Sequence, residues 1–330
     1  MAKLTPNAKG AILALIAFAI FATHDVIVKS LGGTYSPFQI VFFSVLLGFP
    51  LVTLMLIQDA SRDTLRPRHP YWMALRTGAA VVTGASAFYA FAHLPLAQTY
   101  AILFASPLLI TILAIPILGE RVRLRRGLAV AVGLAGVLIV LRPGQADLSA
   151  GHIAAMVAAV GGAISSIIVR KIGPEERSAV LLLYPMIGNF VVMGCAMPFV
   201  YVPMPFADFA ALGVIALLAF IAMIFQIVAY RNGEAVIVAP MQYSQIIWAS
   251  IFGYFIFNEQ VDAMTYIGAG VIILSGIYIV VRESAPNASA NTPVLRTRSR
   301  AGTFGGLRVG ALIRRAQRNQ KRADDLNEDR

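Results

Sequence analysis

Long runs of apolar residues, separated by short polar breaks, extend along most of the chain. The runs have about the 20 residues that an α-helix needs to cross the ~30 Å hydrocarbon core of a bilayer. Proline and glycine stand at most of the breaks, as at Ser36-Pro37 and Gly173-Pro174. The pattern predicts an all-α membrane protein of ten transmembrane helices, at 10–30, 37–57, 71–92, 95–117, 127–141, 151–169, 179–200, 207–229, 235–257 and 263–281.

The composition leaves no segment for a soluble enzymatic domain, because 58% of the residues are hydrophobic and 13% are charged. The first apolar run, 10–23, continues through His24 and Asp25 without a small-residue cleavage site, so we interpret it as a retained helix rather than a signal peptide. The single cysteine, Cys195, excludes disulfides within one chain and cysteine-based metal sites, and we expect it to be a small buried residue. We therefore predict no cofactor and no bound metal.

The basic residues predict the orientation in the membrane. With both termini in the cytoplasm, the outer connections carry only Lys29 and Arg142. This distribution also explains the net charge of +11 better than a nucleic-acid partner does. The inner connections carry Lys3, Lys9, Arg62, Arg66, Arg68, Arg121, Arg123, Arg125, Arg126, Arg170, Lys171, Arg177 and Arg231.

Two distant stretches repeat at nearly the same offset. Residues 9–32 resemble 150–173, which pairs Lys29 with Arg170, and residues 118–142 resemble 257–282, which pairs Glu120 with Glu259. A repeat of five helices has an odd number of spans, so the second copy must enter the membrane from the opposite side. Inverted repeats of this kind are typical of secondary transporters that bind substrate near the midplane, between their halves. We divide the chain into a cytoplasmic N-terminus (1–9), a first repeat (10–141), a second repeat (151–282) and a basic cytoplasmic tail (283–330).

Each half carries a Gly-Glu or Asn-Glu step before a glycine-rich last helix that ends in arginine, a pattern that resembles the EamA type of the drug/metabolite transporter superfamily. The segments DVIVKSLG (25–32), LPLAQTYAILFASPLLITILAIPILGE (94–120) and APMQYSQIIWASIFGYFIFNE (239–259) are most similar to bacterial carriers that take up metabolites such as riboflavin or S-adenosylmethionine. The resemblance implies one polypeptide, or a homodimer, that binds a small organic molecule in a central cavity without ATP. Uptake of riboflavin is our first prediction. Uptake of S-adenosylmethionine and export of an amino acid or another metabolite are the alternatives, because exporters share the architecture.

Ionisable residues inside a span are functional candidates, because a charge at the bilayer centre costs at least ~2.5–3.5 kcal/mol. Asp25 lies about 15 residues into the first span, and Lys29 follows one helical turn later on the same face. We expect the two to pair. Asp25 is then a contact for substrate or protons, with Lys29 as its partner or as an anchor for an anionic group, or the pair is an interfacial salt bridge. His24 is a candidate for proton coupling with Asp25, and packing is its alternative role.

The ninth span contains the densest group of polar and aromatic residues: Gln242, Tyr243, Gln245 and Trp248, directly after Pro240. Because Gln242, Gln245 and Trp248 are three residues apart, they form one helical stripe that could face a cavity and stack on a flat ligand. Interhelical hydrogen bonding is the alternative. Further substrate candidates, each of which could instead serve packing, are Tyr89, Gln98, Tyr100, Ser106, Ser165, Gln226 and Tyr230.

Three other features limit the function. Glu120 and Glu259 could each cap the last helix of their half, because a carboxylate stabilises a helix N-terminus, and a role in coupling is the alternative. No phosphate-binding loop, H-E-x-x-H motif or G-x-S-x-G motif occurs, so an intramembrane enzyme is a remote alternative and we predict that the chain is not an enzyme. The arginine-rich tail predicts either contact with anionic lipid or a disordered segment.

Overall fold

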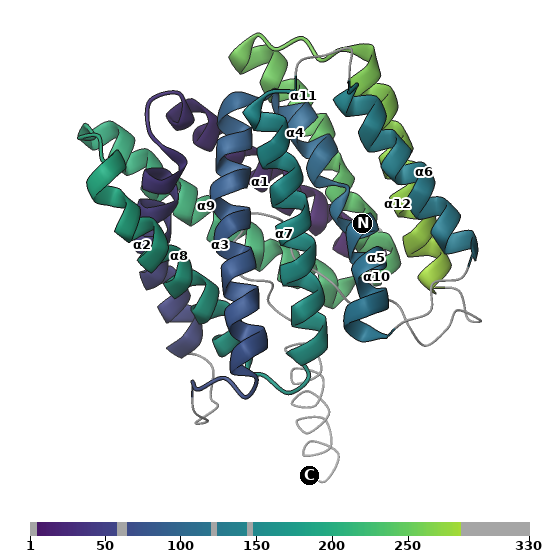
Figure 1. The fold of residues 1–330 in the computed structure, drawn as a ribbon, viewed down its shortest axis with the longest axis horizontal. Coiled ribbons are helices and arrows are strands. Elements are labelled where there is room, and N and C mark those ends of the chain that lie inside the picture. Colours follow the sequence, from purple (N-terminus) through teal and green to yellow (C-terminus); the bar gives the residue numbers. More distant parts are fainter. Residues whose placement is uncertain (1–4, 58–64, 120–123, 144–147, 285–330) are drawn as a thin grey trace.

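In the computed structural model, the described residues are 5–57, 65–119, 124–143 and 148–284, and they form helices without a β-strand. Glu120 and the tail from residue 285 onward, with its predicted lipid contact, lie outside the described residues. Figure 1 shows the arrangement of the elements α1 (Pro6–Gly32), α2 (Pro37–Ile57), α3 (Pro70–His93), α4 (Leu96–Leu103), α5 (Ser106–Leu118), α6 (Leu124–Leu141), α7 (Ala150–Ile172), α8 (Ser178–Val200), α9 (Phe206–Asn232), α10 (Ala235–Val238), the 3-10 helix η1 (Ala239–Tyr243), α11 (Ser244–Phe257) and α12 (Ala263–Ser284).

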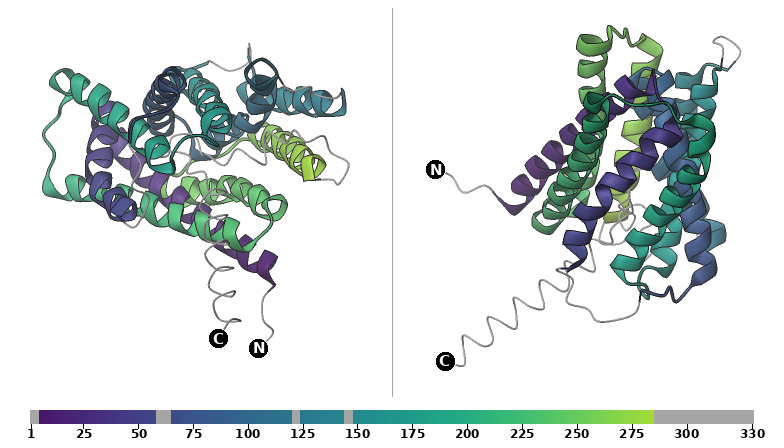
Figure 2. Two further views of the ribbon diagram at one scale, coloured as in Figure 1. Left: turned by 90° about the horizontal axis from the view of Figure 1, so that it is seen from below. Right: turned by 90° about the vertical axis from the view of Figure 1, so that its left-hand side faces the viewer.

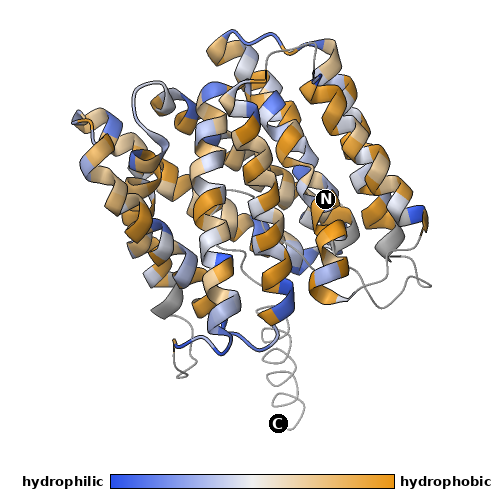
Figure 3. Ribbon diagram, viewed as in Figure 1, coloured by the Kyte–Doolittle hydropathy of each residue, from blue (hydrophilic) through white to orange (hydrophobic). Residues whose placement is uncertain are grey.

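Within the described residues, seven segments are long and apolar enough to cross a membrane, and Gly127–Leu141 is a shorter apolar helix. Hydrophobic residues extend along most of these helices, whereas hydrophilic residues gather near the helix ends (Figure 3). The other two predicted spans, at 71–92 and 235–257, do not reach this standard either. The span at 71–92 includes Arg76, and the span at 235–257 is interrupted by η1. The all-helical membrane fold is therefore confirmed, whereas the count of ten spans and the orientation of the termini remain predictions.

The outer surface of the helices is apolar. Phe199, Phe255 and Leu274 are among many large hydrophobic side chains that are exposed. Such a surface suits contact with lipid, in which the apolar side chains avoid water. Cys195 on α8 is also exposed, so the expectation of a buried cysteine is wrong. Val191 and Val192, one turn earlier on the same helix, are exposed with it, and hydropathy alone does not distinguish an exposed apolar position from one in the protein core.

The two halves pack crosswise. The first helix, α1, packs along α9, and its counterpart α7 packs along α3, the counterpart of α9. The equivalent helices α2 and α8 contact each other, as do α6 and α12. Figures 1 and 2 show the α6–α12 pair set off at one edge of the bundle, opposite α2 and α8. The centre of the molecule is consequently built from helices of both halves.

The fourth and ninth predicted spans are both broken at a proline, as expected from Pro107 and Pro240. Pro107 has no N–H to donate to the carbonyl of Leu103, and the hydroxyl of Ser106 donates to that carbonyl instead, at 2.7 Å. Ser106 also lies 3.3 Å from the carbonyl of Ala159 on α7. Ser106, a candidate for substrate binding, therefore donates a hydrogen bond to a backbone carbonyl that the break between α4 and α5 leaves without its usual partner.

Both broken segments also end in the same way. Gly119 follows α5 with φ 68°, and Asn258 follows α11 with φ 53°. These left-handed residues occupy equivalent positions in the repeat, directly before Glu120 and Glu259. Glycine and asparagine are the residues that adopt this conformation most readily at a helix end. The common geometry supports the relation between the two halves that the sequence repeat predicts.

Candidate substrate-binding site

A hydrogen-bonded cluster of four buried side chains lies between the halves. His24 Nδ1 is 2.7 Å from Asp25 Oδ1, the hydroxyl of Tyr100 donates to Asp25 Oδ2, and Gln245 Nε2 is 3.3 Å from the hydroxyl of Tyr100. Each of the four residues is at most 3% exposed. The cluster combines a carboxylate, an imidazole, a phenol and an amide in an apolar interior.

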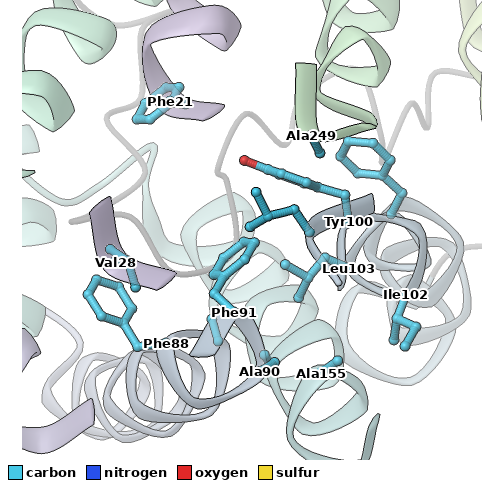
Figure 4. Close-up of a cluster of buried hydrophobic side chains, with 14 of the residues drawn as sticks. Phe21, Val28, Phe88, Ala90, Phe91, Tyr100, Ile102, Leu103, Ala155 and Ala249 are labelled. Atoms are coloured by element: carbon cyan, nitrogen blue, oxygen red, sulfur yellow. The ribbon is translucent and has the colours of Figure 1, made fainter. Parts of the chain in front are cut away.

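Three helices bring these side chains together. His24 and Asp25 are consecutive on α1, Tyr100 is on α4 just before the break, and Gln245 is on α11 just after η1. Figure 4 shows the hydroxyl of Tyr100 directed away from α4 and into the space between the helices. Because α1 and α4 belong to the first half and α11 to the second, the cluster forms only where the halves meet.

Aromatic rings surround the polar cluster. The ring of Tyr100 lies 5.3 Å from that of Phe91 and 5.8 Å from that of Phe104, measured between centroids. The ring of Phe88 contacts the imidazole of His24 edge-on at 6.1 Å. Aromatic faces attract cations as well as flat ligands. The surroundings therefore suit a small ligand that carries a positive charge or a heterocyclic ring.

The chemistry of the cluster depends on Asp25. A carboxylate removed from water must be paired or hydrogen-bonded, because its desolvation is costly. Tyr100 donates to one oxygen, and His24 donates to the other in the tautomer that carries the proton on Nδ1. A cation or a proton that reaches Asp25 replaces or rearranges these donors. The arrangement can thus bind a cationic group or exchange a proton.

Lys29 does not form its ion pair with Asp25, as its position one turn later led us to expect. Its Nζ lies 2.8 Å from Oε1 of Glu259, 2.6 Å from the carbonyl of Leu94 and 3.4 Å from the carbonyl of Phe91. The expected pairing was wrong because the long side chain extends toward the end of α1, where Glu259 and open helix-end carbonyls are available.

The predicted stripe on the ninth span is only partly present. Gln245 is buried in the cluster, whereas Gln242 and Trp248 are half-buried, and the ring of Trp248 stacks on Phe252 at 6.3 Å. Gln242 belongs to the 3-10 helix and Gln245 to the α-helix, so the helical register changes between them. Tyr243 is buried against Phe104 at 5.2 Å, and its hydroxyl is directed at Gly276 of α12.

The other candidates lie outside the four-residue cluster. The ring of Tyr89 stacks on that of His93 at 4.0 Å, and Gln98 Nε2 is 3.0 Å from Nε2 of His152. Tyr230 is buried on α9. Ser165 on α7 and Gln226 on α9 are half-buried, and neither bonds to the four clustered side chains. Their part in substrate binding stays a prediction.

Sequence reasoning missed Glu259 as the partner of Lys29, and it missed the aromatic residues Phe91 and Phe104. Glu259 was predicted to cap the last helix, with a role in coupling as the alternative. In the structure Asp262 caps α12, since its Oδ1 accepts from the N–H of Thr265 at 3.1 Å. The sequence repeat contained a signal for this pair. Each half has a basic residue at the end of its first helix, Lys29 or Arg170, and an acidic residue before its last helix, Glu120 or Glu259.

A helical membrane protein whose crossed halves enclose a buried polar cluster has the architecture of a carrier. The family model of the EamA-like transporter family matches the chain twice, at residues 8–142 and 149–282. The chain therefore belongs to this family, and it is a multi-pass protein of the inner membrane.

The chain is similar to several named transporters over most of their length. It is 27% identical to the S-adenosylmethionine uptake transporter of Rickettsia prowazekii, over 83% of this chain and 93% of that protein. It is 26% identical to the pseudopaline exporter of Pseudomonas aeruginosa, over 81% and 94% of the two chains. It is 24% identical to the riboflavin transporter of Brucella anthropi, over 76% and 90%.

The fold has also been observed in a solved structure. A crystal structure of a protein 17% identical in sequence superposes with a TM-score of 0.57 and covers 84% of this chain and 98% of that chain. At this identity the likeness concerns the fold alone.

Proposed function

We propose that the chain is a secondary transporter that takes up a small cationic metabolite, with S-adenosylmethionine as the first candidate. In this proposal ten spans, in two inverted halves with cytoplasmic termini, alternate in access around the His24–Asp25–Tyr100–Gln245 cluster. The observation that carries the proposal is the buried carboxylate of Asp25, which both halves enclose and which aromatic rings surround.

The charge of the ligand decides between the candidates. A buried carboxylate favours a cation, and S-adenosylmethionine carries a sulfonium and an ammonium group, whereas riboflavin is neutral. The relative from Rickettsia prowazekii supports the same choice. Riboflavin, our first prediction from the sequence, is therefore the second candidate, supported by the amide of Gln245, the aromatic rings and the relative from Brucella.

The test is uptake into vesicles that contain the full-length chain, with labelled S-adenosylmethionine and labelled riboflavin compared in parallel. We expect saturable uptake of S-adenosylmethionine and a loss of about ten- to hundredfold in Asp25→Asn, because a hydrogen bond to a charged group contributes about 1.5–3 kcal/mol. Thr111→Val is the matched control, since this buried hydroxyl bonds only to a carbonyl of its own helix, at 3.1 Å.

Saturable uptake of riboflavin alone would replace the first candidate with the second. Efflux without uptake of either compound would contradict the proposal.

Proton coupling is tested in the same vesicles. If Asp25 carries the coupled proton, Asp25→Asn loses accumulation driven by a pH gradient but retains exchange of labelled for unlabelled substrate. If Asp25 binds the substrate directly, both activities fall together. Unchanged accumulation in Asp25→Asn excludes both roles.

A further inference from the structure

We propose that Lys29 and Glu259 form a lock that closes the face of the protein at which α1 and α3 end, and that this face opens only when the pair separates. The inference rests on the proposed transport function, because a carrier must open each face in turn. Lys29 comes from the first half and Glu259 from the second, and their side chains are 12% and 13% exposed. In the proposed orientation this face is external.

The cation of the lock stabilises the end of α3. Pro95 has no N–H, so it cannot donate to the carbonyl of Phe91, and the chain turns away after Leu94. Lys29 Nζ lies 2.6 Å from the carbonyl of Leu94 and 3.4 Å from that of Phe91. A positive charge at a helix C-terminus is also favoured by the helix dipole. Lys29, a residue of α1, thus donates hydrogen bonds to free carbonyls at the C-terminus of α3.

The anion of the lock stabilises the start of α4. Glu259 Oε2 accepts from the N–H of Leu96, the first residue of that helix, at 3.0 Å, while Oε1 faces Lys29. The left-handed residue Asn258 directs the chain so that Glu259 reaches this position. Gly253 leaves room for the carboxylate, since a Cβ atom there would lie 2.6 Å from Oε2.

The ion pair therefore bridges the corner between α3 and α4, and each charge lies at the helix end that favours it. The corner is complete only while α1 and the segment after α11 both contact it. Separation exposes two charges and leaves two helix ends without their partners, so the pair favours the closed state of this face. Tyr100, which binds Asp25, is on the helix that Glu259 caps, so the lock and the proposed binding site share α4.

The test measures access to a buried position next to the lock in the full-length chain. Ala97 on α4 is completely buried, and in a Cys195→Ser background Ala97→Cys supplies a single reporter thiol. We expect Lys29→Met and Glu259→Gln to speed its reaction with a membrane-impermeant maleimide by about tenfold or more in right-side-out vesicles, the change expected when one partly buried ion pair is lost. The rate in inside-out vesicles should not rise.

Lys171→Met is the matched control. Lys171 also donates to a helix-end carbonyl, that of Ile117 at 2.9 Å, and lies over the ring of Trp72, but at the opposite face. Its loss should leave the reaction rate of the reporter unchanged in right-side-out vesicles. A similar acceleration in Lys171→Met would indicate general loosening of the fold and would overturn the lock.

The exchanged pair, Lys29→Glu with Glu259→Lys, distinguishes a lock between helix ends from a simple attraction of charges. The exchange preserves the ion pair but turns a carboxylate toward the carbonyls of α3 and an ammonium toward the N–H of Leu96. We therefore expect the exchanged variant to react as fast as the single variants. A return to the slow rate of the parent would show that the helix ends contribute nothing and would overturn the proposed geometry.

These readouts separate the lock from the proposed function. The reaction of the reporter thiol requires no knowledge of the substrate, so acceleration in both single variants supports the lock even if neither candidate compound is transported. An unchanged rate in both single variants overturns the lock, and transport by the parent protein then still supports the proposed function.

Discussion

The corner between α3 and α4 and the corner between α9 and α10 occupy equivalent positions in the two halves, but different chemistry closes them. The first is bridged by the partly buried pair of Lys29 and Glu259. At the second, Asn7 of α1 exchanges two exposed hydrogen bonds with Glu234, at 3.0 and 3.4 Å. The second corner therefore relies on exposed hydrogen bonds of a neutral amide, whereas the first relies on a partly buried ion pair.

The second corner also depends on close backbone contact. A Cβ atom on Gly10 would lie 2.6 Å from the Cα of Gly233, so α1 and the end of α9 approach each other at glycines. Opening this corner exchanges exposed hydrogen bonds for bonds to water, which costs little. Opening the first corner leaves a partly buried ion pair without its partners. The difference predicts that the face closed by Asn7 opens more readily than the face closed by Lys29.

The largest expected effect on stability comes from Glu259→Ala. This change removes both the ion pair and the cap of α4, and we expect the free energy of unfolding to fall by about 3 kcal/mol. Denaturant unfolding of the purified protein in detergent measures the loss. Glu234→Ala, which removes the exposed acid of the other corner, is the control and should cost about 0.5 kcal/mol or less. Equal losses in the two variants would show that the corners are energetically alike.

A smaller effect is expected from Gly10→Ala, which tests the close contact at the second corner. The added methyl group must displace the backbone at Gly233, and overpacking of this kind costs about 1–3 kcal/mol. Gly78→Ala on α3 is the matched control, because nothing lies within 4 Å of its Cβ position. The control should be neutral or slightly stabilising, since alanine favours helix over glycine. A stable Gly10→Ala protein would mean that the two helices need not approach so closely.

Gly253→Ala tests the first corner without removing a charge. Its Cβ would lie 2.6 Å from Oε2 of Glu259, so the carboxylate must move away from the N–H of Leu96. Because a flexible side chain moves more easily than backbone, we expect a cost of about 1 kcal/mol, less than for Gly10→Ala. The same unfolding measurement applies. A combined Gly253→Ala and Glu259→Ala protein should be no less stable than Glu259→Ala alone, and additive losses would contradict the displacement of the carboxylate.

Much of this fold follows from local sequence signals. Apolar runs of membrane-crossing length, together with Pro107 and Pro240, predict both the helices and the breaks in two of them, because a missing N–H has a local consequence. The repeat predicts related halves, since the polar positions at its ends recur as well as the apolar ones. The equivalent left-handed ends at Gly119 and Asn258 agree with that prediction.

The candidate site was less predictable, because its geometry depends on how the halves cross. Asp25, Tyr100 and Gln245 were each candidates, but nothing in their spacing places them in one hydrogen-bonded cluster. Helical spacing paired Lys29 with Asp25, whereas the structure pairs it with a residue 230 positions away. Local spacing identifies which groups share a helix face. It does not identify partners on other helices that offer freed carbonyls or opposite charge.

The smallest expected effect belongs to Asn7→Ala, and it sharpens the comparison between the corners most directly. Both hydrogen bonds of Asn7 are exposed, so water replaces them and the free energy of unfolding should change by about 0.5 kcal/mol or less. Access should change by only about twofold, the equivalent of this energy, because these bonds hold α1 to the start of α10. Ala229, a completely buried residue of α9 near this corner, provides the reporter position as Ala229→Cys in the Cys195→Ser background. We expect Asn7→Ala to make this thiol react faster with the maleimide in inside-out vesicles.

Lys29→Met in the same reporter protein is the control and should leave that rate unchanged, because its corner lies at the opposite face. Acceleration by Lys29→Met alone would reverse the assignment of the two corners to the two faces.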